Sequence, residues 1–186
     1  MTLGFRVKSG WAAVVSLDRG RTSPVVLDSR RVELADPGVP HSHQPYHAAF
    51  GTAQTDRATM RRLIRGIERF SRDAVKRLVS QYRGRRAVRR AAVVVASLTD
   101  PASIANQHMR AHASEGQLFR AVLVAALERQ GIAVRVVLER EVYELLATAV
   151  KRSASEAKRR VAALGEHVTP WRAEQKVAAA GAWLIS

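Results

Sequence analysis

The sequence contains no cysteine, which excludes disulfide bonds and thiolate metal ligands. This absence is typical of proteins from a reducing compartment, so we expect a cytoplasmic location. Long apolar runs are missing too, and none approaches the length that crosses a bilayer. Residues 1–11 lack the continuous apolar stretch of a signal peptide. We therefore expect no association with a membrane.

Acidic residues are scarce relative to basic ones. The 186 residues include 31 lysines and arginines but 16 aspartates and glutamates, which gives a net charge of +15. Such an imbalance attracts polyanions, so we expect nucleic acid or another polyanion as the partner. Arginine and alanine are both frequent, and a coding bias without any partner is the alternative. The composition predicts no particular oligomeric state.

Aromatic residues make up 5% of the chain, whereas hydrophobic residues in total make up 47%. The core is therefore expected to consist mainly of small aliphatic side chains. A chain of this length and hydrophobic content is long enough for one ordinary folded domain and short for two. We expect a single domain over residues 1–186.

The first third of the chain is typical of strands followed by a loop. Apolar and β-branched runs separated by turn residues predict an antiparallel meander over 2–7, 11–18 and 25–34. Gly10 in the first turn is free to take a positive φ. Four prolines and glycines predict an irregular loop over 36–55. The loop also contains three histidines, His41, His43 and His47. Their spacing matches no metal motif, which favours a solvated loop over a transition-metal site.

Residues 56–83 show the clearest helical periodicity, with an apolar residue every three or four positions. Thr55 or Asp56 can cap the start of this basic amphipathic helix, and Gly84 can end it. Arginines line its other face and continue beyond its end. The candidates for binding nucleic acid are Arg61, Arg65, Arg69, Arg72, Arg85 and Arg86.

The remaining chain alternates helices and strands. The unbroken apolar run 91–98 predicts a central strand buried on both faces, and 132–138 predicts a fifth strand. Helices are expected over 101–130, 141–164 and 170–185. The first should begin with Asp100-Pro101 and break where Ser114 and Gln117 form a capping box, and the last should begin at Thr169-Pro170. The order βββαβαβα predicts an α/β fold with a five-stranded mixed sheet flanked by helices.

Three segments carry a resemblance to a known family. They are Leu3-Gly4-Phe5-Arg6 with Gly10-Trp11-Ala12, Gln130-Gly131-Ile132-Ala133-Val134 with Glu139-Arg140-Glu141-Val142, and the alanine-rich stretch 173–180. Together with the order of elements, they resemble the RNase H-like superfamily, and in layout its Holliday-junction-resolvase branch. The resemblance implies an RNase H-like fold over most of the chain.

The resemblance also implies a nuclease site from which this sequence departs. Active members hold two Mg²⁺ or Mn²⁺ ions with carboxylates. The first carboxylate belongs where this chain has Arg6, and the second belongs near Ala96 or Ser97, with Asp100 just beyond. Only Glu174 is an acid roughly where the family keeps one. We therefore expect the standard two-metal site to be missing.

Two further groups of residues are candidate sites. On one continuous helix, His108, His112 and Glu115 share a face and could hold zinc or another transition metal. One alternative is a polar site without a metal near these residues. In the other, the histidines bond to the backbone or Asp100, and Glu115 lies in the first turn of a new helix.

Arg6 and Lys8, near the carboxyl end of the first strand, could hold a phosphate, and the alternative is an exposed turn. An ion pair between Arg6 and Glu174 is our preferred interpretation of that region.

Three functions remain open from the sequence. The first is an RNase H-like domain that binds nucleic acid without a two-metal site. The second is a Mg²⁺- or Mn²⁺-dependent nuclease with a rearranged site in which Asp100, Glu115 and Glu174 are catalytic. The third is a protein-interaction module whose basic face binds an acidic partner.

Overall fold

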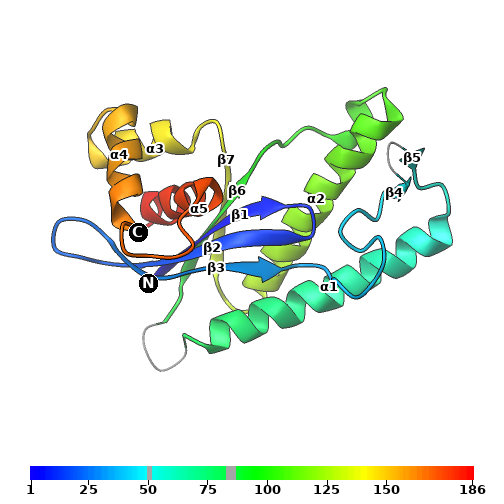
Figure 1. The fold of residues 1–186 in the computed structure, drawn as a ribbon, viewed down its shortest axis with the longest axis horizontal. Helices are drawn as coiled ribbons and strands as arrows, with labels where there is room; N and C mark the ends of the chain where they lie inside the picture. Colours follow the sequence, from blue (N-terminus) through cyan, green and yellow to red (C-terminus); the bar gives the residue numbers. More distant parts are fainter. Residues whose placement is uncertain (50–51, 83–86) are drawn as a thin grey trace.

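A computed structural model describes residues 1–49, 52–82 and 87–186. Its main sheet has five strands in the order β3-β2-β1-β6-β7, and β6 and β7 run parallel to β1. The antiparallel meander and the five-stranded mixed sheet are thus confirmed, with β3 at one edge (Figure 1). The strands are β1 (Thr2–Lys8), β2 (Trp11–Asp18), β3 (Val25–Glu33), β6 (Arg90–Val95) and β7 (Ala133–Leu138).

The expectation that 91–98 is the central strand is wrong in two respects. The middle strand is β1, because β7 adds outside β6 and leaves β6 one position from the edge. The strand also ends at Val95, and the next residues, Ala96 and Ser97, are exposed. Its expected burial on both faces holds for residues 91–95.

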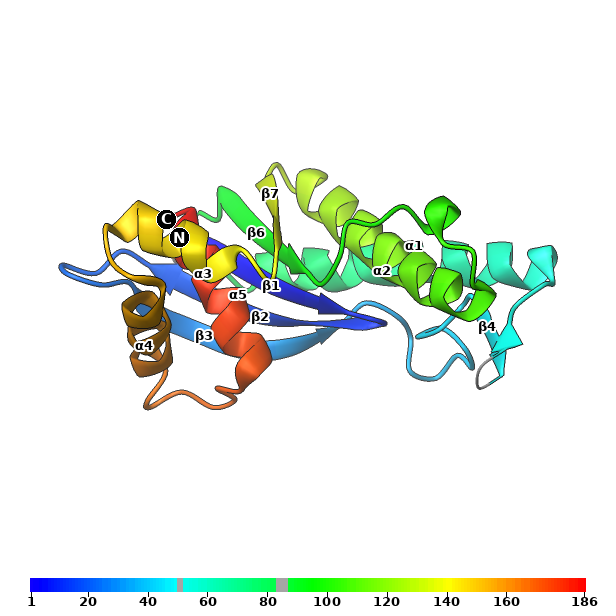
Figure 2. The ribbon, with the colours of Figure 1, turned by 90° about the horizontal axis from the view of Figure 1, so that it is seen from above.

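Helices cover both faces of the sheet (Figures 1 and 2). Two long helices, α1 (Arg57–Ser80) and α2 (Gln107–Glu128), lie side by side on one face. The other face carries α3 (Val142–Val150), α4 (Ala154–Leu164) and α5 (Ala173–Leu184). Within the described ranges, no helix is both long enough and apolar enough to span a lipid bilayer.

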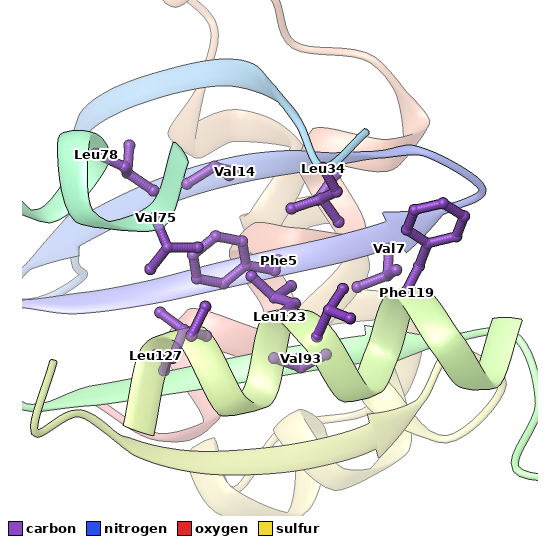
Figure 3. Packing of buried hydrophobic residues seen from close by; sticks show 14 of the residues in the cluster. Phe5, Val7, Val14, Leu34, Val75, Leu78, Val93, Phe119, Leu123 and Leu127 are labelled. Carbon is purple, nitrogen blue, oxygen red and sulfur yellow. The ribbon is translucent and has the colours of Figure 1, made fainter. Parts of the chain in front are cut away.

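The core consists of two apolar layers that β1 separates. Alternate residues of a strand point to opposite faces, and Phe5 and Val7 lie with Val75 of α1 and Leu123 of α2 (Figure 3). On the opposite face, α5 packs its small side chains directly against the sheet. The contact is so close that a Cβ atom on Gly4 would lie 1.8 Å from the carbonyl oxygen of Ala178.

The predicted break at Ser114 is wrong, because α2 is continuous. The helix begins later than expected, and the side chain of its N-cap Asn106 accepts a 3.0 Å hydrogen bond from the Met109 N–H. Asp100 and Pro101 do form an N-cap and first-position pair, but they start a separate 3₁₀ turn, Pro101–Ser103. A capping sequence inside a helix therefore does not end it when the flanking residues continue the periodicity.

The two C-terminal helices also differ from prediction. The segment 141–164 is divided into α3 and α4, because Lys151 takes a left-handed conformation with φ 55° and Ser153 caps the new helix. The last helix begins at Ala173, after Pro170. Its start is fixed by Gln175, whose side chain accepts a hydrogen bond from the Arg172 N–H.

The loop 36–55 is not wholly irregular. It contains the short strands β4 (His47–Ala49) and β5 (Thr52–Ala53), which pair with each other. The N-terminal cap of α1 is Asp56, whose carboxylate accepts hydrogen bonds from the Ala58 and Thr59 N–H groups. The expected end at Gly84 lies outside the described residues.

The contact between Gly4 and α5 leads to a first prediction. Gly4→Ala should lower the free energy of unfolding by about 2 kcal/mol, because its methyl group must displace the backbone of α5. Gly66→Ala is the matched control: apart from the adjoining backbone of α1, no atom of the described residues lies within 4 Å of its Cβ position, so alanine should raise stability by up to about 1 kcal/mol. Urea denaturation measures both changes. Equal stabilities of the two variants would contradict the close packing.

Candidate functional site

The carboxyl ends of the three parallel strands meet at one edge of the sheet, where ligands of α/β proteins commonly bind. A pocket of about 280 Å³ lies there, between the end of β1, the end of β6 and the middle of α2. Three cationic residues contribute to its lining: Arg6, Lys8 and Arg120. The pocket therefore offers positive charge at the place where a strand-end ligand would lie.

Arg6 is the charged residue at the centre of this edge and is only 4% exposed. Its side chain points to the same face of β1 as Gly4 and forms an ion pair with Glu139. Glu139 follows β7, and its N–H donates a 2.8 Å hydrogen bond to the carbonyl oxygen of Val95. The buried guanidinium is thus neutralised by a carboxylate that the end of the sheet holds in place.

The predicted ion pair between Arg6 and Glu174 is wrong. Glu174, in the first turn of α5, lies 3.8 Å from the amino group of Lys8 instead. The Arg6 side chain extends in the opposite direction, across β6. Its partner Glu139 lies beyond the end of β7, the strand that pairs with β6. The prediction failed because the position of Glu139 depends on strand order rather than on sequence spacing.

The arrangement does not fit the paired Mg²⁺ or Mn²⁺ ions that an RNase H-like fold implies. Those ions need oxygen ligands, but the middle strand presents a guanidinium. The three acids proposed for a rearranged site are engaged separately. Asp100 caps the 3₁₀ turn, Glu115 bonds to His47, and Glu174 faces Lys8. A catalytic role for these three acids stays a prediction.

A second polar cluster lies where β4 meets the N-terminal half of α2. The Nε2 atom of His47 lies 3.3 Å from Nδ1 of His108, and Nε2 of His108 lies 3.2 Å from Nε2 of His112. His108 and His112 share one face of α2 with Glu115, as the periodicity predicted. That His108, His112 and Glu115 hold a transition metal stays a prediction.

Glu115 is fully buried, next to the imidazole rings of His47 and His112. Its Oε1 atom lies 2.7 Å from Nδ1 of His47, within hydrogen-bonding distance, whereas Oε2 has no hydrogen-bond partner among the described residues and lies 3.7 Å from Nδ1 of His112. Burial raises the pKa of Glu115, and the contact with His47 opposes this shift. Burial, together with the charges of His47 and His108, lowers the pKa of His112.

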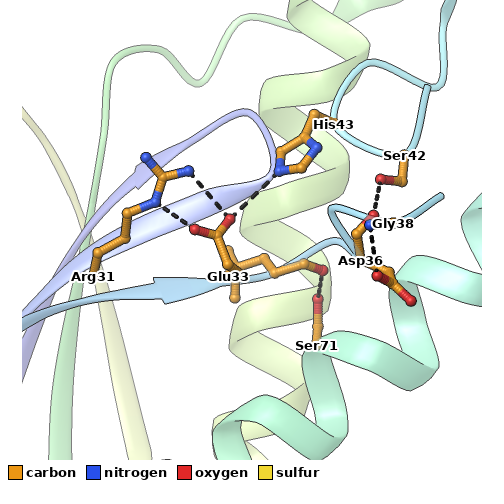
Figure 4. A network of polar contacts seen from close by, with 8 residues as sticks. Arg31, Glu33, Asp36, Gly38, Ser42, His43 and Ser71 are labelled. Carbon is orange, nitrogen blue, oxygen red and sulfur yellow. Dashed lines mark hydrogen bonds and ion pairs between the residues drawn. The ribbon is translucent and has the colours of Figure 1, made fainter. Parts of the chain in front are cut away.

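The interpretation of the three loop histidines as solvated is wrong for His47, which is 5% exposed. His43 instead bonds to Glu33 at 3.4 Å, and Glu33 in turn binds Arg31 (Figure 4). His41 is exposed, as expected. Sequence spacing could not single out His47, because its partner Glu115 lies 68 residues away.

The outer face of α1 carries the predicted arginines. Arg61, Arg65, Arg69 and Arg72 are all exposed, while the opposite face of the helix is buried against the core. The Nε atom of Arg72 lies 3.5 Å from Oδ1 of Asp73, the next residue in the chain. Arg85 and Arg86 lie outside the described residues. The four arginines of α1 thus form a cationic face, which we call the α1 arginine face.

No protein-family model matches the sequence, and no curated protein matches it. The fold itself is RNase H-like, as the order of elements predicted. It is shared with RuvC of Thermus thermophilus, with a TM-score of 0.57 and 14% identity over 98% of this chain and 90% of that one. A structure of T. thermophilus RuvC in complex with a Holliday junction substrate gives a TM-score of 0.59 and 13% sequence identity, again over 98% of this chain and 90% of that one. The yeast mitochondrial Holliday junction resolvase Ydc2 gives a TM-score of 0.47 and 10% sequence identity, over 98% of this chain and 77% of that one.

The ion pair of Arg6 leads to a second prediction. Glu139→Ala should lower the free energy of unfolding by about 1–3 kcal/mol, because it leaves a buried guanidinium without its partner. The loss should be smaller than the about 3–5 kcal/mol of a fully buried pair, because Glu139 is 40% exposed.

Two further variants make this measurement specific. Adding Arg6→Met to Glu139→Ala should restore much of the stability, since the orphaned charge is then removed. Glu68→Ala removes an exposed carboxylate of α1 and should change stability by no more than about 0.5 kcal/mol. A Glu139→Ala variant as stable as Glu68→Ala would contradict the role assigned to the ion pair.

Proposed function

We propose that this protein binds nucleic acid through two cationic surfaces of an RNase H-like scaffold and does not cleave it by a two-metal mechanism. The observation that carries the proposal is the buried Arg6 at the end of the middle strand, paired with Glu139. A guanidinium cannot ligate Mg²⁺, and the partly exposed Lys8 next to it gives this strand end a cation that can attract a phosphate. The same edge of the sheet therefore suits an anion better than a metal ion.

The pocket at the strand ends is the first of the two surfaces. Lys8 is 39% exposed and reaches the pocket from the end of β1, and the half-buried Arg120 reaches it from α2. A phosphate in the pocket would meet charged donors from two sides. Such charge-assisted hydrogen bonds are about twice as strong as neutral ones.

The α1 arginine face is the second surface. Arg61, Arg65 and Arg69 follow one another at four-residue intervals and therefore form a row along the helix, with a rise of about 6 Å between neighbours. Exposed arginines in a row can contact successive phosphates without reading bases. A nucleic acid is also the ligand class present in the RuvC complex with a Holliday junction substrate, which supports the same class of partner here.

A third prediction tests the α1 arginine face. Replacing Arg61, Arg65, Arg69 and Arg72 together with glutamine should weaken binding to mixed-sequence DNA at least about tenfold, or about 1.4 kcal/mol. The slope of log K against log salt should flatten by up to about 0.9 for each phosphate that the variant no longer neutralises, since fewer counterions are released. Fluorescence anisotropy over a series of salt concentrations measures both quantities.

The control has the same change of charge on the opposite face. Glutamine at Lys151, Arg152, Lys158 and Arg159 also removes four exposed cations, in and next to α4. This control variant should keep most of the parent's affinity for DNA and most of the slope of log K against log salt. If both quadruple variants bind DNA as the parent does, the proposal fails for this face, and an acidic protein becomes the better candidate partner.

A fourth prediction concerns cleavage. With Mg²⁺ or Mn²⁺ present, the protein should bind four-way-junction DNA and leave its strands intact, because the guanidinium of Arg6 lies where a metal ligand is needed. Gel electrophoresis of labelled junctions, single strands and RNA–DNA hybrids measures this. Cleavage that Glu174→Gln abolishes would contradict the proposal and favour the nuclease with a rearranged site.

A further inference from the structure

We propose that His47, His108 and His112 form a binding site for one divalent transition-metal ion of the Zn²⁺ type, and that Glu115 orients His47 toward the ion. One ring nitrogen from each histidine can be chosen so that all three lie within 4.8 Å of one another. The site lies between β4 and α2 and is separate from the strand-end position where the fold family keeps its Mg²⁺ or Mn²⁺ ions.

A single ion would draw the three histidine nitrogens closer together than the 4.8 Å within which they lie in this structure. Zinc binds histidine nitrogens at about 2.0–2.1 Å, so two ligands of a tetrahedral ion lie about 3.4 Å apart. The contacts that His108 makes to His47 and to His112 measure 3.3 and 3.2 Å. They use different nitrogens of His108, of which one ion can bind only one, so the binding of an ion requires a rotation of His112, whose side chain is 44% exposed.

The hydrogen bond from His47 to Glu115 fixes which nitrogen is free for a metal. An ionised carboxylate can only accept, so Nδ1 of His47 carries the proton that is donated to Glu115. The lone pair of His47 is then on Nε2, which faces His108. A carboxylate behind a metal-binding histidine is a recurrent arrangement that fixes the orientation of the ring and increases its basicity.

The buried charge of Glu115 gives a second, independent reason for a cation. Within the described parts of the chain, its Oε2 atom accepts no hydrogen bond although Glu115 is fully buried. An isolated carboxylate is costly at such a position. The imidazoles of His47 and His112 face it from β4 and α2, and Tyr46, next to His47, also interacts with its charge. A divalent ion held by the three histidines would compensate this charge.

The ligand type selects the kind of metal. Three neutral imidazoles suit Zn²⁺, Cu²⁺ or Ni²⁺, whereas Mg²⁺ and Ca²⁺ require oxygen ligands. Three histidines leave the fourth position of a tetrahedral ion to water or a small anion. Because His47 belongs to β4 and the other two ligands belong to α2, the ion would also fasten the segment before α1 to the helical layer.

The experiment titrates the metal-stripped full-length protein with ZnCl₂ by calorimetry and records the visible spectrum with CoCl₂. We expect one equivalent to bind, with the absorption of tetrahedral Co²⁺. His112→Ala removes a partly exposed ligand and should weaken binding by at least about 100-fold, more than the loss of an outer partner does. Glu115→Gln should weaken binding by about 10–100-fold and keep the stoichiometry.

His41→Asn is the matched control, because it removes an exposed histidine of the same loop and asparagine tolerates the φ of 61° there. It should bind Zn²⁺ as the parent does. Circular dichroism checks that each variant folds. No uptake by the parent, unchanged affinity in a folded His112→Ala variant, an equal loss in His41→Asn, or displacement of Zn²⁺ by excess Mg²⁺ would each overturn the proposal.

Discussion

The burial of β1 on both faces is the constraint on which the rest of the structure depends. Every side chain on this strand has to fit a layer of helices, and apolar residues fill the face toward α1 and α2. On the other face, Gly4 leaves room for the backbone of α5, and Arg6 requires a carboxylate. The placement of α5 and the end of β7 both follow from these two residues. A charge on the middle strand is tolerated because its partner, Glu139, directly follows the edge strand β7 of the same sheet.

Local signals predicted most of the fold. Runs of β-branched residues, turn residues and a 3.6-residue period depend on neighbouring residues alone, and they identified all five strands of the main sheet and the basic helix. Boundaries were harder to predict. Ser114 looks like a cap when read locally, but the apolar face of α2 continues through it and packing keeps the helix intact. The left-handed turn at Lys151 has no glycine to mark it in the sequence.

The candidate sites could be predicted only in part, for a different reason. His108, His112 and Glu115 follow helical spacing and were recognisable on one face, whereas His47 joins them from a distant loop. Glu139 similarly meets Arg6 because two crossovers place β7 beside β6. Such partners depend on strand order and loop placement, which spacing along the chain does not encode. His112 contributes to both the histidine cluster and the strand-end pocket, so the two regions are neighbours.

The hydrogen bond between His47 and Glu115 also has a consequence for chain entropy. It joins residues 68 positions apart, so the chain between them, which includes α1 and β6, forms a closed loop whenever the contact is made. Closing a loop of this size carries an entropic penalty that grows only slowly with its length. A cross-link at this point would remove that penalty from folding, because the unfolded chain would already be closed. The contact therefore connects the two ends of a long loop in the middle of the chain, between residues 47 and 115.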